Sequence, residues 1–399
     1  MVVGLMMNMI KLIKSTFYKE KETKNKLCAF IKKAEMLSFG SECRKFEHSF
    51  AAYQGRKHCV FVNSGSSANL AIIQALLNVG KIKKGDEVGF SALTWSTNVM
   101  PLIQLDLIPV PIDCELDTLN VSSHKLLSAL HKKPIKMLFL TNLLGFCDDI
   151  DEIVRICKER NILLIEDNCE SLGTVYKGKK LGNFGLASTF SFYVGHHMST
   201  VEGGAVCTDD TGLETMLQLV RAHGWDRNLT EDKQLKIRMK HNVNKTFYNR
   251  YTFYDLGYNL RTTEIQGFIG NTQIPYLSEI IEKRQKNFKR LAKAIYANVD
   301  RYYPIRYDHI DILSNFAVPI ICRSQTIRDE LVKKCDGVVE IRPIVGGNMT
   351  KQPFYSKYFN GIHQDSLTNA GIANNQGLYF GNNPELTEKE LKTLLSIFS

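Results

Sequence analysis

Residues 191–204 read SFYVGHHMSTVEGG and overlap or adjoin two apolar runs, 187–193 and 204–208, that predict β-strands. Two adjacent histidines stand in the middle of the segment. Metal ligands on a helix favour i, i+4 spacing, whereas adjacent side chains point apart, so the pair does not predict a metal site. A single imidazole can transfer protons near neutral pH. The segment therefore predicts a proton-transfer role for His196 and a structural role for His197.

Short apolar runs alternate with helical patterns over the preceding part of the chain. The predicted strands are 58–62, 87–90, 107–112, 136–141 and 162–166, and helical patterns at 67–78 and 148–160 lie between some of them. Continuous apolar strands joined by helices indicate a mostly parallel sheet covered on both faces. Ligands of such α/β sheets bind at the carboxyl ends of the strands. The sequence therefore predicts an α/β fold with its site at that edge.

The remaining segments predict a second, smaller unit. Residues 11–37 read as one or two basic helices, 211–250 as polar and irregular, and about 262–296 as one long helix. The last hundred residues have the pattern of a small α+β domain. The predicted domains are a large cofactor-binding α/β domain at 38–275 and a small α+β domain made of 1–37 plus 276–399.

The composition is that of a globular enzyme. Of 399 residues, 44% are hydrophobic and 23% charged. The net charge is +10, but the lysines are scattered, which argues against a nucleic-acid partner and is compatible with a local site for an anionic small substrate. The ten cysteines lack CxxC and zinc-site spacing, which indicates reduced thiols and a cytoplasmic location. No apolar run approaches the ~18 residues of a membrane helix, so no membrane partner is expected.

A turn rich in serine follows the first predicted strand and opens a helix. Residues 63–69 read NSGSSAN, which places Ser66 and Ser67 in the first helical turn. Backbone N–H groups at a helix N-terminus, together with small hydroxyl side chains, form a cradle for phosphate. The same pattern also fits a serine that only caps an ordinary helix, and the turn alone does not decide between the two.

Two more features follow predicted strands. Residues 166–170 read EDNCE, and a carboxylate there could keep the ring nitrogen of a heteroaromatic cofactor protonated, so that the ring acts as an electron sink. A helix N-cap aspartate is the competing interpretation. Trp95 follows another strand, where it could stack on such a ring or belong to the core. The order of turn, aromatic, acid and histidine segment along one α/β domain favours a common site.

Five stretches of the chain carry a resemblance to a known family. They are NSGSSANL (63–70), EDNCESLG (166–173), SFYVGHHMSTVEGG (191–204), GYNLRTTEIQ (257–266) and GLYFGNNPELTEKEL (377–391). From about residue 40 to the C-terminus the chain resembles the DegT/DnrJ/EryC1/StrS sugar aminotransferases. The resemblance implies the aspartate-aminotransferase-type fold (fold type I) and pyridoxal 5′-phosphate (PLP) as cofactor.

The chain departs from the common pattern of this family at its central position. Family members anchor PLP through a lysine, and His196 stands at that place. Imidazole cannot form the same imine, so PLP or its pyridoxamine form would be held without a covalent bond. Together with IRPIVGGNMTKQP (341–353), this resembles the lysine-less sugar 3-dehydratase branch that serves colitose and lipopolysaccharide O-antigen synthesis. A sister branch with the same histidine carries a [2Fe–2S] cluster through a motif with a C-x-C pair. No two cysteines here are separated by one residue, so the resemblance is to the branch without an iron–sulfur cluster.

The resemblance also implies a role for individual residues. His196 would be the catalytic base. The implied cofactor contacts are Asp167 to the ring nitrogen, Ser66, Ser67 and Ser191 to the phosphate, Trp95 stacked on the ring, and Glu170 near its face or its 3′-oxygen. Asn259 would reach the phosphate of the other subunit of a homodimer, whose active sites lie at the interface. Arg342 would bind the carboxylate of glutamate, or it is a surface or interdomain arginine.

The implied reaction removes the C3 hydroxyl of a nucleotide-linked 4-keto-6-deoxyhexose. GDP-4-keto-6-deoxymannose is the expected substrate and glutamate the amino donor, and the products are a 4-keto-3,6-dideoxy sugar and ammonia. One alternative is a sugar-nucleotide aminotransferase that tolerates the histidine. A non-catalytic cofactor-binding protein of the same fold is the other, since fold alone does not establish activity.

Overall fold

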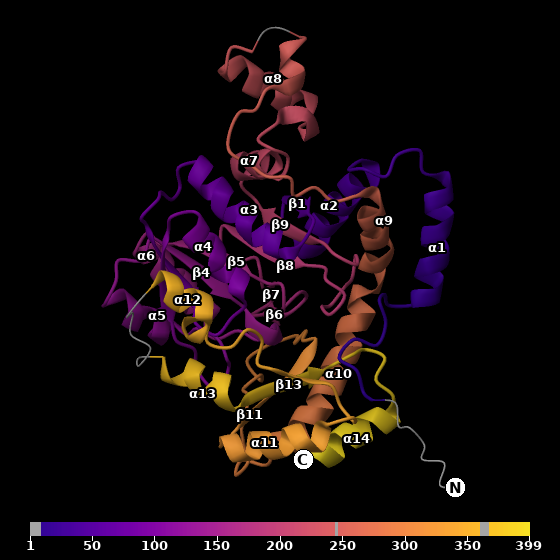
Figure 1. The fold of residues 1–399 in the computed structure, drawn as a ribbon, viewed down its shortest axis with the longest axis vertical. Helices are drawn as coiled ribbons and strands as arrows, with labels where there is room; N and C mark the ends of the chain where they lie inside the picture. The colour runs from indigo at the N-terminus through magenta and orange to yellow at the C-terminus, as the bar shows by residue number, and fades with distance from the viewer. Residues whose placement is uncertain (1–8, 244–245, 360–366) are drawn as a thin grey trace.

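A seven-stranded, mostly parallel sheet forms the centre of the molecule (Figure 1). The computed structural model describes residues 9–243, 246–359 and 367–399. The strands, in spatial order, are β1 (His58–Val62), β9 (Gly204–Thr208), β8 (Ala187–Ser191), β5 (Leu163–Asp167), β4 (Met137–Thr141), β2 (Glu87–Ser91) and β3 (Ile108–Ile112). Only β9 runs antiparallel to its neighbours. The predicted mostly parallel sheet is therefore confirmed.

Helices cover both faces of this sheet, which explains why its strands are continuous apolar runs. Along β4, Met137 and Phe139 belong to the core shared with α3 (Gly65–Asn78). The alternate residues Leu138 and Leu140 belong to the core shared with two helices, α5 (Ser123–Leu130) and α6 (Ile150–Glu159). Successive side chains of a strand point to opposite faces, so each face of β4 is buried by its own helical layer.

A second sheet of four antiparallel strands lies in the C-terminal part (Figure 1). Its order is β10 (Tyr302–Tyr303), β11 (Ala317–Cys322), β13 (Gly377–Gly381) and β12 (Ile341–Pro343). The accompanying helices are α11 (Gln325–Cys335), α12 (Pro353–Tyr358), α13 (Thr368–Gln376) and α14 (Glu388–Phe398). The predicted α+β character of the last hundred residues is therefore observed.

The prediction of one continuous helix at about 262–296 is wrong. The chain forms α9 (Glu264–Gln273), a 3₁₀ turn (Ile274–Tyr276) and then α10 (Leu277–Ile295). Pro275 lies in the 3₁₀ turn, and proline lacks the N–H that a continuing α-helix needs. The break lets the chain leave the large sheet along α9 and reach the small sheet along α10 (Figure 1).

The predicted irregular segment 211–250 instead contains two helices. In α7 (Thr211–Arg221) the side chain of Asp210 caps the N-terminus by accepting from the Leu213 N–H at 3.0 Å. No residue of α8 (Glu231–Lys240) is buried, so this helix has no apolar stripe by which it could be recognised. The basic N-terminal region likewise forms one helix, α1 (Glu20–Lys33), rather than helix throughout 11–37.

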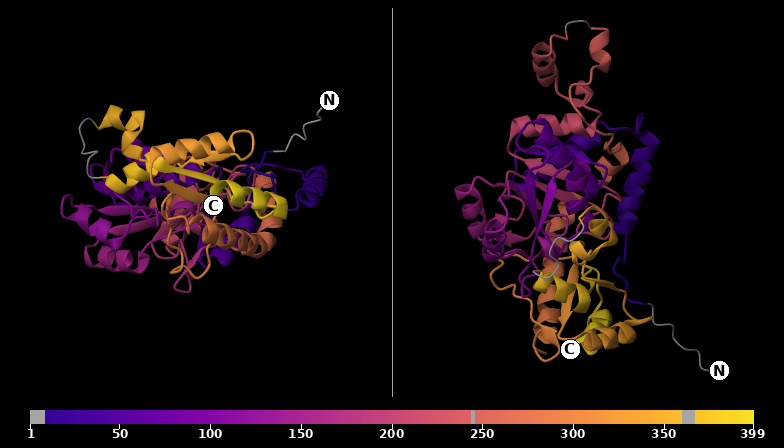
Figure 2. Two further views of the ribbon diagram at one scale, coloured as in Figure 1. Left: turned by 90° about the horizontal axis from the view of Figure 1, so that it is seen from below. Right: turned by 60° about the vertical axis from the view of Figure 1, so that its left-hand side comes forward.

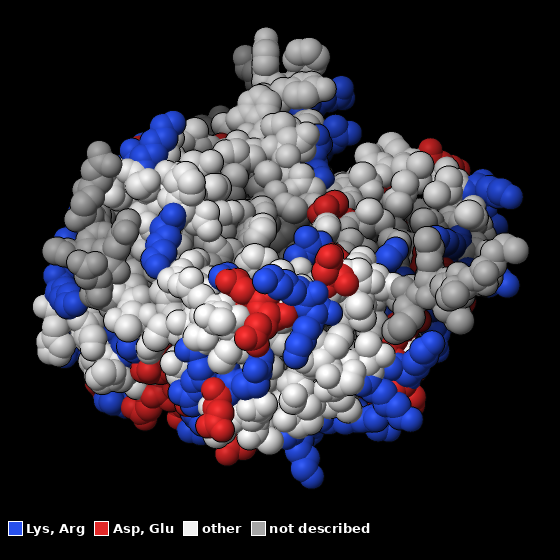
Figure 3. Space-filling view, turned by 60° about the horizontal axis from the view of Figure 1, so that its bottom comes forward, with Lys and Arg blue, Asp and Glu red and all other residues white. Residues whose placement is uncertain are grey.

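Helix α8 stands away from the body of the molecule as the tip of an arm (Figures 1 and 2). Several apolar side chains of this arm are exposed, namely Leu235, Met239, Phe247, Tyr248, Tyr251, Phe253 and Leu256. On the face shown in Figure 3, basic side chains are interspersed with acidic ones and form no single basic patch. None of the helices in the described ranges is long and apolar enough to cross a membrane.

Candidate active site

Three chain segments meet at the carboxyl ends of β5 and β8, and a glycine sets how closely they approach. Asp167 ends β5, Ser191 ends β8, and Gly65 opens α3. A Cβ placed on Gly65 would lie 2.6 Å from the Ser191 Cβ and 3.0 Å from the Cys169 Sγ. Because only glycine fits this contact, the serine turn is packed directly against the two strand ends.

The serine turn combines a helix cap with an accessible hydroxyl group. Ser64 Oγ accepts from the Ser67 N–H at 3.0 Å, and the two hydroxyl oxygens are also 3.0 Å apart. Ser66, between them, is exposed, whereas Ser191 beside the turn is buried. The capping interpretation is thus correct for Ser64. The adjoining N-terminus of the 14-residue helix α3 still offers N–H groups and a positive dipole end to an anion.

Asp167 is buried and held in one orientation by neutral donors. Its Oδ2 accepts from Asn69 Nδ2 at 2.9 Å and from Asn98 Nδ2 at 2.7 Å, and its Oδ1 accepts from the Cys169 N–H at 2.9 Å. An ionised carboxylate has about four acceptor positions, so Oδ1 can accept one more hydrogen bond. No helix begins after Asp167, so the competing interpretation as a helix N-cap is wrong.

The neighbouring Glu166 points to the opposite side of the strand and has a structural role. Its carboxylate accepts from the backbone N–H groups of Gly182, Phe184 and Gly185 at 2.7 Å each. A fourth donor is Asn142 Nδ2 at 3.2 Å. Four donors fill its acceptor positions, so of these two adjacent acids only Asp167 is free to bind a further donor.

The aromatic side chain predicted at the site is accessible. Trp95 is 53% exposed and precedes the 3₁₀ turn Ser96–Asn98. The interpretation of Trp95 as a core residue is therefore wrong. The same turn supplies Asn98, whose Oδ1 accepts from Thr94 Oγ1 at 2.9 Å and whose Nδ2 holds Asp167. The exposed Trp95 therefore lies close in the chain to Asn98, which orients the Asp167 carboxylate.

His196 lies in a tight turn after β8, and its imidazole is only partly accessible. The His196 N–H donates to the Tyr193 carbonyl at 2.9 Å, and the ring lies between those of Tyr193 and Phe316, at centroid distances of 5.9 and 5.3 Å. Its Nδ1 has no hydrogen-bond partner among the described residues. Burial lowers the pKa of His196 to about 4, an effect opposed by the Asp167 carboxylate and reinforced by Arg284. The imidazole is therefore a neutral proton acceptor at pH 7.

The adjacent His197 has the surroundings of a structural histidine. Its side chain is 3% exposed, and its Nε2 lies 3.0 Å from the Ser314 carbonyl oxygen. Burial lowers its pKa well below the ordinary value, with Arg284 acting in the same direction. This buried, backbone-bonded ring is the arrangement predicted from the sequence for the second histidine.

Glu170 is a partly buried acid near Asp167. Its Oε2 accepts from the Leu144 N–H at 2.9 Å. Burial raises the pKa of Glu170 to about 8; the hydrogen bond from Leu144 opposes the rise, and the nearby Asp167 charge adds to it. Glu170 is therefore mostly protonated at pH 7 and can donate a hydrogen bond.

Arg342 and Asn259 are both exposed in the single chain. Arg342, on β12, is paired in register with Tyr379, whose ring lies 6.1 Å from that of Phe316, the neighbour of His196. The Arg342 guanidinium donates to the Glu340 carboxylate. Asn259 accepts from Arg261 Nε at 3.0 Å. The strand pairing therefore places Arg342 opposite Tyr379, whose ring neighbours that of Phe316, whereas Asn259 has no hydrogen bond to the other predicted site residues of the described chain.

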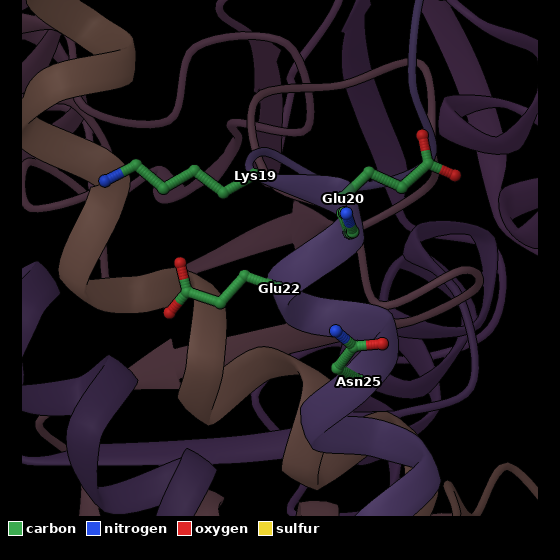
Figure 4. Close-up of a pocket in the computed structure, with 5 residues that line it drawn as sticks. Lys19, Glu20, Glu22 and Asn25 are labelled. Carbon is green, nitrogen blue, oxygen red and sulfur yellow. The ribbon is translucent and has the colours of Figure 1, made fainter.

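A hollow lies at the start of α1, and none of these residues lines it (Figure 4). It is lined by Lys19, Glu20, Lys21, Glu22 and Asn25. Glu20 and Glu22 point in different directions (Figure 4), and each pairs with a lysine one helical turn further on. Exposed pairs of this kind are weak and solvated, so the hollow has no convergent group that would mark a catalytic site.

The sequence also matches known proteins. The sequence pattern of the DegT/DnrJ/EryC1/StrS aminotransferase family covers residues 18–399. The chain belongs to this family. GDP-4-keto-6-deoxy-D-mannose 3-dehydratase of Yersinia pseudotuberculosis is 36% identical over 375 residues, which span 91% of this chain and 92% of that protein.

Two solved structures of GDP-4-keto-6-deoxymannose-3-dehydratase share the fold, each with 31% identity over 98% of this chain and 100% of that one. A histidine-to-asparagine mutant with bound GDP-perosamine has a TM-score of 0.88. A structure with a trapped PLP-glutamate geminal diamine has a TM-score of 0.86. The predicted family and aminotransferase-type fold are confirmed.

For this member of the DegT/DnrJ/EryC1/StrS family, reasoning from the sequence missed the residues that orient Asp167. Asn69 lies within NSGSSAN, and Asn98 lies three residues after Trp95, but the sequence pattern indicated no role for either. A single asparagine belongs to no hydrophobic periodicity, so the sequence pattern does not mark it as a site residue. Both residues are nonetheless fully buried polar groups, a class that has hydrogen-bond partners in nearly every structure.

Proposed function

We propose that this chain is a PLP-dependent 3-dehydratase of a nucleotide-linked 4-keto-6-deoxyhexose, with GDP-4-keto-6-deoxymannose as substrate. The observation that carries the proposal is a neutral imidazole, that of His196, at the place of the cofactor lysine in a site that keeps its oriented carboxylate and its serine cradle. The relatives named 3-dehydratases support the same activity and substrate.

The residues present fit PLP held without a covalent bond. Oδ1 of Asp167 can accept the ring N–H, because the two asparagines occupy Oδ2. Ser66, Ser67 and Ser191 surround the N-terminus of α3, where the phosphate would lie, and the exposed Trp95 would cover the ring. When bound with its nitrogen protonated, PLP supplies an electron sink for bond cleavage at the attached sugar.

His196 and Glu170 divide the proton chemistry. The neutral His196 imidazole takes the proton that is lost from the carbon next to the ring and then carries it to the departing C3 hydroxyl. Glu170, mostly protonated at pH 7, can donate a hydrogen bond to an oxygen at the ring face without adding a second negative charge beside Asp167. His196 offers no amine that could reprotonate the sugar and release an amino sugar. The unsaturated amine left after loss of the C3 hydroxyl would instead be released, and its tautomerisation and hydrolysis by water would give ammonia and a 4-keto-3,6-dideoxy sugar.

Glutamate is the proposed amino donor, and Arg342 is the proposed contact for its carboxylate. Arg342 is exposed, and the pairing of its strand with Tyr379 leads to Phe316 and His196. The guanidinium group already pairs with Glu340, so the incoming carboxylate would compete with that acid. The glutamate adduct in a solved relative supports this donor.

We further propose a homodimer with Asn259 of each subunit at the phosphate of the other. The exposed position of Asn259 and the uncovered aromatic side chains of the α8 arm, such as Phe247 and Tyr251, support an interface on this part of the molecule. The ten free cysteines and a nucleotide-sugar substrate support a cytoplasmic location.

An incubation of the purified chain with PLP, glutamate and GDP-4-keto-6-deoxymannose tests the activity, with the sugar nucleotide read by mass spectrometry. We expect a product lighter by one oxygen atom, together with 2-oxoglutarate and ammonia. Formation of an amino sugar would instead establish the aminotransferase alternative. No conversion of this or other 4-keto-6-deoxy sugar nucleotides, with PLP bound, would establish the non-catalytic alternative.

A further inference from the structure

Arg284 is a buried cation at a place where the surrounding helix is apolar. The buried face of α10 consists of Leu277, Ile280, Ile281, Arg284, Phe288, Leu291, Ala292 and Ile295. The Arg284 side chain is 5% exposed and forms no ion pair with any described residue, and its Nε has no hydrogen-bond partner there. Burying a charge without a counter-ion is costly, so an apolar residue would be the stable choice for folding alone.

The contact that Arg284 does make leads to the active site. Its Nη2 donates to the His196 carbonyl oxygen at 3.1 Å. The backbone of Arg284 is fixed in turn, because its carbonyl accepts from Asn382 Nδ2 at 2.9 Å. The guanidinium therefore ties the turn that carries His196 to α10.

Arg284 also contributes to the electrostatic surroundings of the imidazole. The charged and titratable groups around His196 are Asp167 on β5, Arg284 on α10, and Tyr193 and His197 on its own segment. The ring of Phe316, directly before β11, lies beside it. Asp167 favours the imidazolium form and Arg284 disfavours it. Burial lowers the pKa of Arg284 to about 9, so its charge is still present at pH 7.

We propose that Arg284 is a positioning residue, which fixes the His196 turn through the His196 carbonyl and places a positive charge near the imidazole that disfavours its protonation. The proposal rests on the proposed function, in which His196 removes a proton. It explains why an unpaired cation is kept in an apolar helix face: its charge offsets that of Asp167, the carboxylate needed for the cofactor ring.

Two variants separate the charge from the hydrogen bond. Arg284→Gln keeps an N–H donor for the His196 carbonyl but removes the charge, and Arg284→Lys keeps the charge. The full chain, labelled at histidine Cε1 with ¹³C, is titrated by NMR from about pH 8.5 to about pH 4.5, and His196→Asn assigns the signal. Substrate is absent, so the result is independent of whether the dehydration assay succeeds.

We expect His196 to stay neutral over nearly this whole range, both in the wild type and in the Arg284→Lys variant. In Arg284→Gln the pKa of His196 should rise by at least about one unit, because one charge has that effect even from about 12 Å at an effective dielectric constant of about 20. Titration of wild-type His196 near its ordinary pKa would overturn the proposal, and so would equal titration in the two variants. The wild-type titration alone can overturn the proposal, even if a variant does not fold.

Discussion

The contact at Gly65 gives a quantitative prediction about the assembly of the site. In Gly65→Ala the new Cβ would lie 2.6 Å from the Ser191 Cβ and 3.0 Å from both the Ser191 Oγ and the Cys169 Sγ. Ser191 is a buried strand end and cannot swing away freely, so the turn or the strand must shift. Overpacking of this kind costs about 1–3 kcal/mol. We expect a fall of this size in the free energy of unfolding, measured by urea titration with circular dichroism.

The same displacement should weaken PLP binding, because it moves the serine turn away from Ser191. A loss of about 1.4 kcal/mol corresponds to a tenfold increase in the dissociation constant, which equilibrium dialysis can measure. Adding Ser191→Gly removes the two obstructing Ser191 atoms and leaves only the Cys169 Sγ at 3.0 Å, so the double variant should regain part of the lost stability. It should not regain PLP affinity, because the Ser191 hydroxyl is lost as well.

Gly371→Ala is the matched control. Gly371 lies within α13, and its new Cβ would meet only the Lys351 Nζ, at an ordinary 3.7 Å. Alanine is favoured over glycine inside a helix by about 0.5–1 kcal/mol, so this variant should be stabilised and bind PLP normally. The reasoning would be refuted if Gly65→Ala matched the wild type both in unfolding free energy, within about 0.5 kcal/mol, and in PLP affinity.

Two further predictions concern the titratable groups. His196→Asn should abolish loss of the C3 hydroxyl in the mass-spectrometric assay while PLP binding by dialysis stays close to wild type, because asparagine cannot accept the proton; dehydration that survives would show that another group is the base. Burial raises the pKa of Glu170 to about 8, so the folded chain binds a proton that the unfolded chain has lost above its ordinary pKa, and stability should fall as the pH rises from about 4.5 to about 8. In Glu170→Gln the free energy of unfolding, from urea titrations at several pH values, should change less over this interval. A fall as steep as that of the wild type would contradict the raised pKa of Glu170.

The sequence predicted the large sheet well where each strand is a short apolar run between polar turns. Strands 58–62 and 204–208 agree with β1 and β9 in both bounds. The sequence pattern failed to predict the helical segments that are not marked by an apolar stripe alone. Pro275 interrupts the predicted helix at 262–296, and α8 forms without any buried residue. Periodicity reports burial, so a helix with no buried face gives no signal.

For the site, the sequence identified the positions at the strand ends but not which side chains face one another. Glu166 and Asp167 are adjacent acids, and neither composition nor spacing separates them. The layers of the fold distinguish Glu166 from Asp167. Ile165 and Ala187 belong to the core beneath α3, so Asp167 and Ser191, two and four residues later on their strands, lie on that same face.

Alternation along the strands thus places the carboxylate and the serine on the face from which α3 begins. Val60 and Val62 of β1 pack in the same core, and the serine turn at the start of α3 follows that strand directly. Glu166, one residue out of phase, points into the other layer and satisfies the backbone of 182–185 instead. The site is therefore a consequence of strand phase: shifting β5 by one residue would bury Asp167 in the opposite layer and place Glu166 on the face from which α3 begins.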